Sequence, residues 1–219
     1  MSLFNSDAFL AFRSRDFSLL SVNQLCLILA IMIQEVVIAY SVYQLTQNPL
    51  SLGMIALIEL LPFICLSLIS GDWADRYNRQ KIVQWSFSCS TLIPLLFIVL
   101  FSQYQQQHIQ QNTLLCGIYS LIFCLGILRG IYSPSFNSLR PFLTPESAYS
   151  NAATWTALIW QIGGILAPLC AGLLLGQLGL KKTLLIVFFL CCVGSICLFG
   201  LSARDFPSTH KQHLSKSLK

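Results

Sequence analysis

Charged residues are scarce in this chain. Only 10% of its 219 residues are Asp, Glu, Lys or Arg, whereas soluble domains carry about 25%. The mean hydropathy of +0.70 and the hydrophobic share of 55% point the same way, to an integral membrane protein rather than a soluble domain. The net charge of +5 does not indicate nucleic-acid binding, because the basic residues lie in short segments between apolar runs and form no stripe.

Patterns for redox chemistry, metal binding or catalysis are missing as well. None of the nine cysteines forms a C-x-x-C pair, and all nine fall within apolar runs, where cysteine behaves as a small hydrophobe. His108, His210 and His213 lie outside these runs, and no metal-ligand set or Ser/His pair is positioned to react. We therefore expect no cofactor, no metal site and no enzyme activity.

Six apolar runs are long enough to cross a membrane. At ~1.5 Å per residue, about 20 residues span ~30 Å of hydrocarbon. The first run contains Glu35 and is too long for a secretory signal peptide, so we keep it as a helix. The runs cover approximately 19–45, 52–70, 82–102, 113–133, a fifth from a helix start at 144–146 to 175, and 183–201.

The predicted organisation has three parts. Residues 1–17, with phenylalanines around two arginines, predict a cytoplasmic interfacial helix, the alternative being a disordered terminus. Residues 18–201 form the six-helix transmembrane domain. Residues 202–219 are polar and basic without an apolar period, which predicts a disordered cytoplasmic tail.

Basic residues set the expected orientation. With a cytoplasmic N-terminus, ten lysines and arginines lie on the inner side, and only Lys181 and Lys182 lie outside, where they can extend to the headgroups. Both termini are therefore predicted to be cytoplasmic. The inner set is Arg13, Arg15, Arg76, Arg79, Lys81, Arg140, Arg204, Lys211, Lys216 and Lys219.

The segment 71–81 holds five of the chain's 21 charged residues between two apolar runs, and we expect it to be a loop. It resembles the G-x-x-x-D-R-x-G-R-[RK] signature between the second and third helices of major facilitator superfamily transporters. Asn78 replaces a glycine, and we expect it to preserve the turn through a left-handed backbone. The alternative is a generic positive-inside loop. The corresponding residues are Gly71, Asp75, Arg76, Arg79 and Lys81.

Three more segments resemble the efflux branch of this superfamily, which includes siderophore (enterobactin-type) and macrolide exporters. Residues 42–53 resemble the connection between the first two helices, and Arg129 with 134–141 resembles the exit of the fourth. The fifth run resembles the exporter pattern G-x-x-x-G-P-x-x-G-G, with alanine in place of two glycines. The residues it retains are Gly163, Pro168 and Gly172. Gly172 and Gly176, four residues apart, also predict a close helix contact.

This resemblance implies an all-α integral membrane fold of six transmembrane helices, one half of a major facilitator fold built as a 3+3 inverted repeat. It implies a bacterial cytoplasmic (inner) membrane protein that exports a small amphipathic molecule against proton entry. In the family, the motif residue matching Asp75 packs against a helix of the second half and closes an inner gate.

Because the sequence corresponds to one half, three interpretations remain open. The chain is a truncated or split transporter, a chain that pairs with a copy of itself or with a separate second half, or a non-functional remnant. A membrane-embedded scaffold or assembly subunit is the alternative function. The expected partners are the lipid bilayer and a small-molecule substrate, and not nucleic acid.

Three charged residues, Glu35, Glu59 and Arg129, lie within apolar runs. Inserting a charge at mid-membrane costs roughly 2.5–3.5 kcal/mol unless the charge is paired or in contact with water. Glu35 and Glu59 fall at similar depth, and we hypothesise that they carry the coupling proton. The alternative is that each is neutral and hydrogen-bonded to a neighbour such as Gln34 or Ser67. Arg129 either contacts an anionic group near the inner mouth or extends to inner phosphates. Its estimated depth, ~18 Å from Glu35, predicts no direct pairing of those two side chains.

Overall fold

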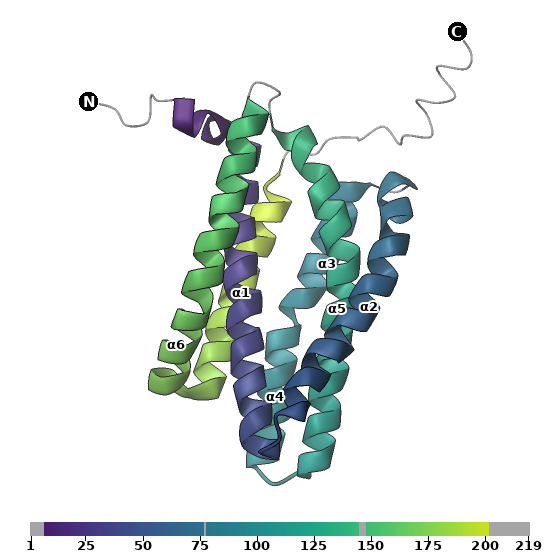
Figure 1. Ribbon diagram of the computed structural model, residues 1–219, viewed down its shortest axis with the longest axis vertical. Coiled ribbons are helices and arrows are strands. Elements are labelled where there is room, and N and C mark those ends of the chain that lie inside the picture. Colours follow the sequence, from purple (N-terminus) through teal and green to yellow (C-terminus); the bar gives the residue numbers. More distant parts are fainter. Residues whose placement is uncertain (1–6, 77, 145–147, 202–219) are drawn as a thin grey trace.

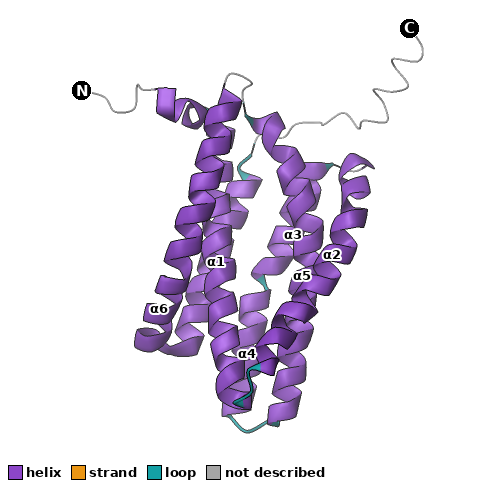
Figure 2. Ribbon diagram, in the orientation of Figure 1, coloured by secondary structure: helices purple, strands orange, loops and turns teal. Residues whose placement is uncertain are grey.

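The computed structural model describes residues 7–76, 78–144 and 148–201, and every regular element in these ranges is a helix (Figures 1 and 2). Five stretches are long and apolar enough to cross a membrane, because α3 and α4 together make one of them. The predicted all-helical class is confirmed. The helices are η2 (Asp7–Arg13), α1 (Arg15–Thr46), α2 (Leu50–Arg76), α3 (Arg79–Thr91), α4 (Ile93–Gln105), α5 (Gln111–Leu143) and α6 (Tyr149–Phe199).

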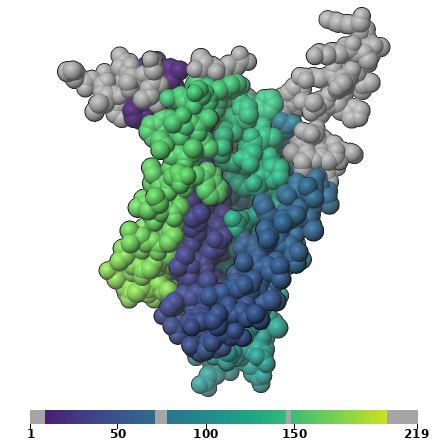
Figure 3. All heavy atoms as spheres, in the orientation of Figure 1, coloured from purple at the N-terminus to yellow at the C-terminus, as the bar shows by residue number. Residues whose placement is uncertain are grey.

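Helix α1 forms the centre of the bundle. It lies in a recess between α6 on one side and α2 and α5 on the other (Figures 1 and 3). Its apolar residues Ile33, Val37 and Val42 are buried against Phe97 of α4 and Leu184 of α6. Ile33 and Val37, four positions apart, lie on one face of α1, whereas Val42 lies on the opposite side, so α1 is buried by neighbours on more than one face.

The third apolar run is divided into α3 and α4. The division falls at Leu92, whose backbone stays close to helical (φ −76°, ψ −22°). Pro94 follows in the first turn of α4, where its missing N–H leaves the carbonyl one turn earlier without a helical donor. The two helices together still cover Arg79–Gln105, long enough for one crossing.

Helix α5 continues well beyond the predicted end of the fourth run. The fourth apolar run predicts a helix end near residue 133, and this is wrong, because the helix runs through Pro134 and Pro141 to Leu143. A proline removes only one backbone donor, and packing against neighbouring helices sustains such a helix in a membrane. Arg129 therefore lies near the middle of a long helix and not close to its inner end.

The fifth and sixth runs belong to one 51-residue element, α6, which is interrupted at Gly179. Gly179 has φ +76° and ψ 173°, a conformation that is essentially restricted to glycine. At this point the chain reverses, so that residues 180–199 run back beside α1 (Figure 1). Val187 and Cys191 on this returning segment belong to the main apolar core.

The segment 71–81 is mostly helical and not an extended loop. Helix α2 continues to Arg76, and α3 begins at Arg79. Asn78 does not adopt the predicted left-handed backbone. It is extended (φ −67°, ψ 107°), and its side chain caps α3 by accepting hydrogen bonds from the backbone N–H groups of Gln80 and Lys81.

Two predicted features lie partly or wholly outside the described residues. One is the transporter-like signature, of which the surroundings of Gly71, Asp75 and Arg76 are not described. The other is the predicted tail 202–219. At the other end of the chain, α1 begins at Arg15, a few residues before the predicted start of the transmembrane domain at residue 18.

Candidate functional site

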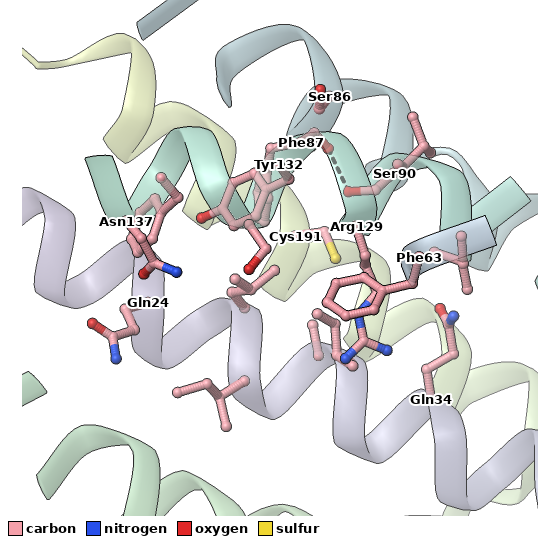
Figure 4. Close-up of a pocket in the computed structure, with 18 of the residues that line it drawn as sticks. Gln24, Gln34, Phe63, Ser86, Phe87, Ser90, Arg129, Tyr132, Asn137 and Cys191 are labelled. Atoms are coloured by element: carbon pink, nitrogen blue, oxygen red, sulfur yellow. Dashed lines mark hydrogen bonds between the residues drawn. The ribbon is translucent and has the colours of Figure 1, made fainter. Parts of the chain in front are cut away.

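A cavity of about 240 Å³ lies between α1, α3, α5 and α6, with one side chain, Phe63, contributed by α2. Figure 4 shows Gln24 and Asn137 at one end, Arg129 and Gln34 at the other, and Tyr132 between them. Aromatic and aliphatic side chains make up most of the wall. Such a lining, apolar with a few polar groups, is typical of small-molecule sites. The aromatic lining residues are Phe63, Phe87, Tyr132, Phe136 and Trp160.

At one end of the cavity, Arg129 of α5 holds two carboxylates. Its Nη1 donates to Oε1 of Glu35 on α1 at 2.7 Å and also to Oε1 of Glu59 on α2. The Glu35 side chain is 45% exposed, Arg129 33% and Glu59 16%, so Glu35 is the most exposed member of the cluster. One guanidinium thus links three helices.

The prediction that Arg129 and Glu35 do not pair is wrong. It rested on a helix end near Pro134, which placed Arg129 about four residues from the inner end. In the structure 14 residues separate Arg129 from Leu143, and 20 separate Glu35 from Arg15. At ~1.5 Å per residue the depths differ by only ~9 Å, which two long side chains and a helix tilt can span.

Close packing of α2 against α5 brings Glu59 to Arg129. A Cβ atom on Gly126 would lie 2.7 Å from Cγ of Pro62, and one on Gly130 would lie 3.0 Å from Cβ of Leu66. Ser70 of α2 also donates to the carbonyl of Gly130 at 2.7 Å. The spacing Gly126-x-x-x-Gly130 lets the two backbones approach, as small residues do between membrane helices.

The face of Gly172 and Gly176 is small enough for a close helix contact, as the sequence indicates, but no other part of the described chain packs against it. No heavy atom lies within 4 Å of the Cβ position at either glycine. The small-residue spacing is therefore present twice, in α5 and in α6, and only the pair in α5 is covered by another described helix. Spacing alone does not say which face of a helix is covered.

The exporter-like residues of the fifth run lie apart from the cavity. Gly163 packs against Ile28 of α1, where an added Cβ would lie 2.5 Å from Cγ2 of that isoleucine. Pro168 and Gly172 are exposed. Of the residues that match the transporter signature in 71–81, Arg79 has its guanidinium carbon 5.3 Å from the centre of the Phe142 ring, and Lys81 is exposed. The structure brings together Glu35, Glu59 and Arg129, and none of these other residues joins them.

At the other end of the cavity, three neutral polar side chains and Arg140 connect α1, α5 and α6. Tyr132 donates its hydroxyl to Oδ1 of Asn23 at 3.1 Å, and Nδ2 of Asn23 donates to the carbonyl of Gly194 at 2.9 Å. Gln24 accepts from Nη2 of Arg140 at 3.1 Å and donates to the carbonyl of Thr156 at 3.2 Å. These bonds fix the side chains of α1 that face the cavity.

Sequence reasoning did not identify Gln24, Tyr132 and Arg140 as site residues. The available signal was the set of polar residues inside the first run, Asn23, Gln24 and Gln34, because amide side chains in a membrane helix face a polar neighbour or a wet cavity. In the described residues no group of three His, Cys, Asp or Glu side chains could hold a metal ion.

Residues 20–217 match the family model of the Major Facilitator Superfamily. The chain is 26% identical over 128 residues to the Staphyloferrin A transporter of Staphylococcus aureus, covering 58% of this chain and 31% of that protein. It is 28% identical over 135 residues to the multi-drug resistance efflux pump PmrA of Streptococcus pneumoniae, covering 61% and 30%.

The uncharacterized MFS-type transporter YfiS of Bacillus subtilis is 24% identical over 160 residues, covering 72% of this chain and 36% of that protein. The chain thus spans about a third of the length of the curated relatives it matches. The family match over residues 20–217, together with the all-helical fold and its apolar helices, means that this chain belongs to the Major Facilitator Superfamily.

Proposed function

We propose that this chain acts in proton-driven efflux of a small amphipathic molecule, with the cavity as the substrate site. The observation that carries the proposal is the Arg129 cluster, in which one guanidinium binds Glu35 and Glu59 at the edge of a cavity of mixed polarity. Two of the relatives are a transporter and an efflux pump by name, which supports export as the direction.

Glu35 and Glu59 have different roles in this proposal. A proton that binds Oε1 of Glu35 removes the negative charge, so the ion pair that joins α1 to α5 is lost while Glu59 still holds α5 to α2. The helix pair α2–α5 can then move relative to α1. Release of the proton on the other side of the membrane restores the pair, which couples proton movement to a change in the cavity.

The proposed topology has six membrane crossings with both termini in the cytoplasm of a bacterial cell, and a 3+3 inverted repeat. A helix of 51 residues would extend ~76 Å, more than twice the ~30 Å of hydrocarbon, which supports two crossings for α6 on either side of Gly179. Helices α3 and α4 then make one crossing together.

A partner completes the proposed transporter. We propose assembly with a second six-helix half or with another copy of the chain, and the exposed apolar residues of α2 and α6, such as Leu68 and Ile165, support it. In that assembly Asp75, with Arg76, Arg79 and Lys81, would form the conformational gate against a partner helix. Pro168 and Gly172, which are exposed, would line the exporter-like face of α6, while Gly163 holds α6 against α1.

Replacing the cluster carboxylates tests the function. Cells that express the chain are loaded with ethidium, a cation, or with fluorescein, an anion, and efflux is followed with and without an uncoupler. We expect uncoupler-sensitive efflux of at least one dye, and Glu35→Gln to slow it at least tenfold because the variant cannot exchange a proton at that position. Glu59→Gln should slow it less, since Glu59 is the less accessible carboxylate.

Glu146→Gln is the matched control, because Glu146 is the chain's remaining glutamate and belongs to the predicted start of the fifth helix, not to the interior of an apolar run. Wild-type efflux by Glu35→Gln in a proton gradient contradicts proton coupling through this residue. Absence of efflux, together with stable copurification of another membrane protein, would instead indicate a scaffold.

A further inference from the structure

A second arginine lies in the cavity, away from the Arg129 cluster. Arg140 follows Arg129 by eleven positions on α5, which places it ~16 Å further along the helix. Its guanidinium lies over the Phe136 ring at 5.0 Å from the centroid, and Nη2 donates to Gln24. Nε is buried and has no hydrogen-bond partner.

The charge of Arg140 is not compensated within the described part of the chain. Arg129 is held by two carboxylates, whereas the groups beside Arg140 are neutral: the Gln24 amide, the Phe136 ring and the Tyr132 phenol. A guanidinium has five N–H donors, and the single hydrogen bond to Gln24 uses one of them. A cation partly removed from water is costly unless an anion pairs with it.

The Gln24 side chain holds Arg140 in this position. Its Nε2 donates to the carbonyl of Thr156 on α6, so its oxygen remains directed toward Arg140. Arg140 is therefore fixed from two sides, by an amide and by an aromatic face, with its remaining donors unused. This arrangement suits a planar two-oxygen acceptor, which an arginine binds with two parallel hydrogen bonds.

We propose that Arg140 binds the anionic group, a carboxylate or phosphate, of an amphipathic ligand whose apolar body lies along the aromatic wall of the cavity. Tyr132 and Phe136 are stacked at 5.0 Å, and the ring of Phe87 lies 5.7 Å from that of Tyr132. These rings line the cavity along the ~16 Å between the two arginines. The inference rests on the proposed transport function, because it takes the cavity to be the substrate site.

Binding of a charged probe and its neutral counterpart tests the inference. The full chain is placed in phosphatidylcholine nanodiscs and titrated calorimetrically with 4-butylbenzoate or 4-butylbenzamide, and the signal of empty discs is subtracted. We expect the benzoate to bind at least tenfold more tightly than the benzamide. Arg140→Gln should abolish this preference, and Arg140→Lys should retain part of it because the charge remains while the planar donor pair is lost.

Arg15→Gln is the matched control, since Arg15 is an exposed arginine outside the cavity and should leave the preference unchanged. Thermal unfolding shows whether each variant is folded. If Arg140→Gln is unfolded, Arg140→Lys decides, because a folded lysine variant must show a reduced preference. Equal binding of the two probes to the wild-type chain, or a preference that persists in folded Arg140→Gln, overturns the proposal.

Nanodiscs that contain phosphatidylglycerol distinguish the two sources of an anionic group. Weaker benzoate binding in these discs, for the wild-type chain and not for Arg140→Gln, supports an anion site that a lipid headgroup can occupy. Unchanged binding supports a site for a soluble anion. The titration measures binding without transport, so the two proposals can fail separately. If the benzoate and the benzamide bind equally while efflux still depends on Glu35, only the anion site is refuted. Arg140-dependent binding without proton-linked efflux refutes the transport function alone.

Discussion

Arg129 links three helices through one guanidinium. Each of its bonds joins α5 to a different helix, α1 through Glu35 and α2 through Glu59. Without the guanidinium, two carboxylates would lie close together in a poorly solvated position and repel each other. The cluster is therefore structural as well as the proposed coupling site, and the two roles can be separated by comparing substitutions.

Arg129→Met should destabilise the chain more than either glutamine variant. It removes two charge-assisted hydrogen bonds and leaves both carboxylates unpaired, for a loss of about 2 kcal/mol once partial exposure is allowed for. For a chain of this size this corresponds to a melting temperature lower by ~4–8 °C. Thermal unfolding of the variant and the wild-type chain in detergent measures this difference in melting temperature.

A second substitution checks the cause. Adding Glu35→Gln to Arg129→Met should recover part of the lost stability, because it neutralises one of the unpaired carboxylates. Lys182→Met, which removes an exposed cation, should change little. If the double variant melts below Arg129→Met, repulsion between the carboxylates is not the reason for the loss.

The charged residues of the site could be found from the sequence, and their partners could not. Glu35, Glu59 and Arg129 are conspicuous because a charge inside an apolar run requires a reason. Their pairing depends on depth, which in turn depends on where α5 ends, and Pro134 suggested an end about ten residues too early. Gln24 carries a weaker signal, as an amide inside an apolar run, and Tyr132 carries none, since aromatic side chains are common in membrane helices.

At the scale of the helices, the approach of α2 to α5 determines the geometry of the site. Gly126→Ala should be destabilising, because the new Cβ would meet the α2 backbone at Glu59 and the ring of Pro62. Overpacking of this kind typically costs about 1–3 kcal/mol. Displacing α2 also moves Glu59 away from Arg129, so the variant should lose transport as well as stability.

Gly172→Ala is the matched control for this prediction. Nothing lies within 4 Å of its Cβ position, and alanine favours a helix by about 1 kcal/mol over glycine. Its melting temperature should therefore be unchanged or raised, while that of Gly126→Ala falls. Equal melting temperatures for the two variants would mean that α2 and α5 are not in close contact at Gly126.

Apolar run length predicted the positions of the helices well, and local residue chemistry predicted their ends less well. The runs give α1, the combined α3–α4 and the start of α2 within a few residues. Helices α2 and α5 continue beyond the predicted ends, into the charged segment 71–76 and through Pro134. For α5, packing against α2 at Gly126 and Gly130 supports the helix, and the sequence of one segment does not reveal such a neighbour.

At the scale of the whole molecule, much of the apolar surface faces outward. Helix α2 exposes Leu57, Leu61 and Leu68, and α6 exposes Ile165 and Leu169. Exposed apolar patches of this extent mark a membrane or a protein interface. The hydrocarbon of the bilayer and the helices of the proposed partner half are both compatible with these faces.

Epitope insertion tests the proposed topology. A tag after Gln107, in the exposed turn between α4 and α5, should bind antibody on intact spheroplasts, as should a tag after Gly179. Tags after Arg76 and Lys219 should bind only after permeabilisation, because the excess of basic residues holds those segments inside. If α6 crosses the membrane once, the Lys219 tag is reached from outside and the Gly179 tag is not. Labelling of the Arg76 tag on intact spheroplasts would reverse the orientation and with it the assignment of Arg140 to the cytoplasmic end of the cavity.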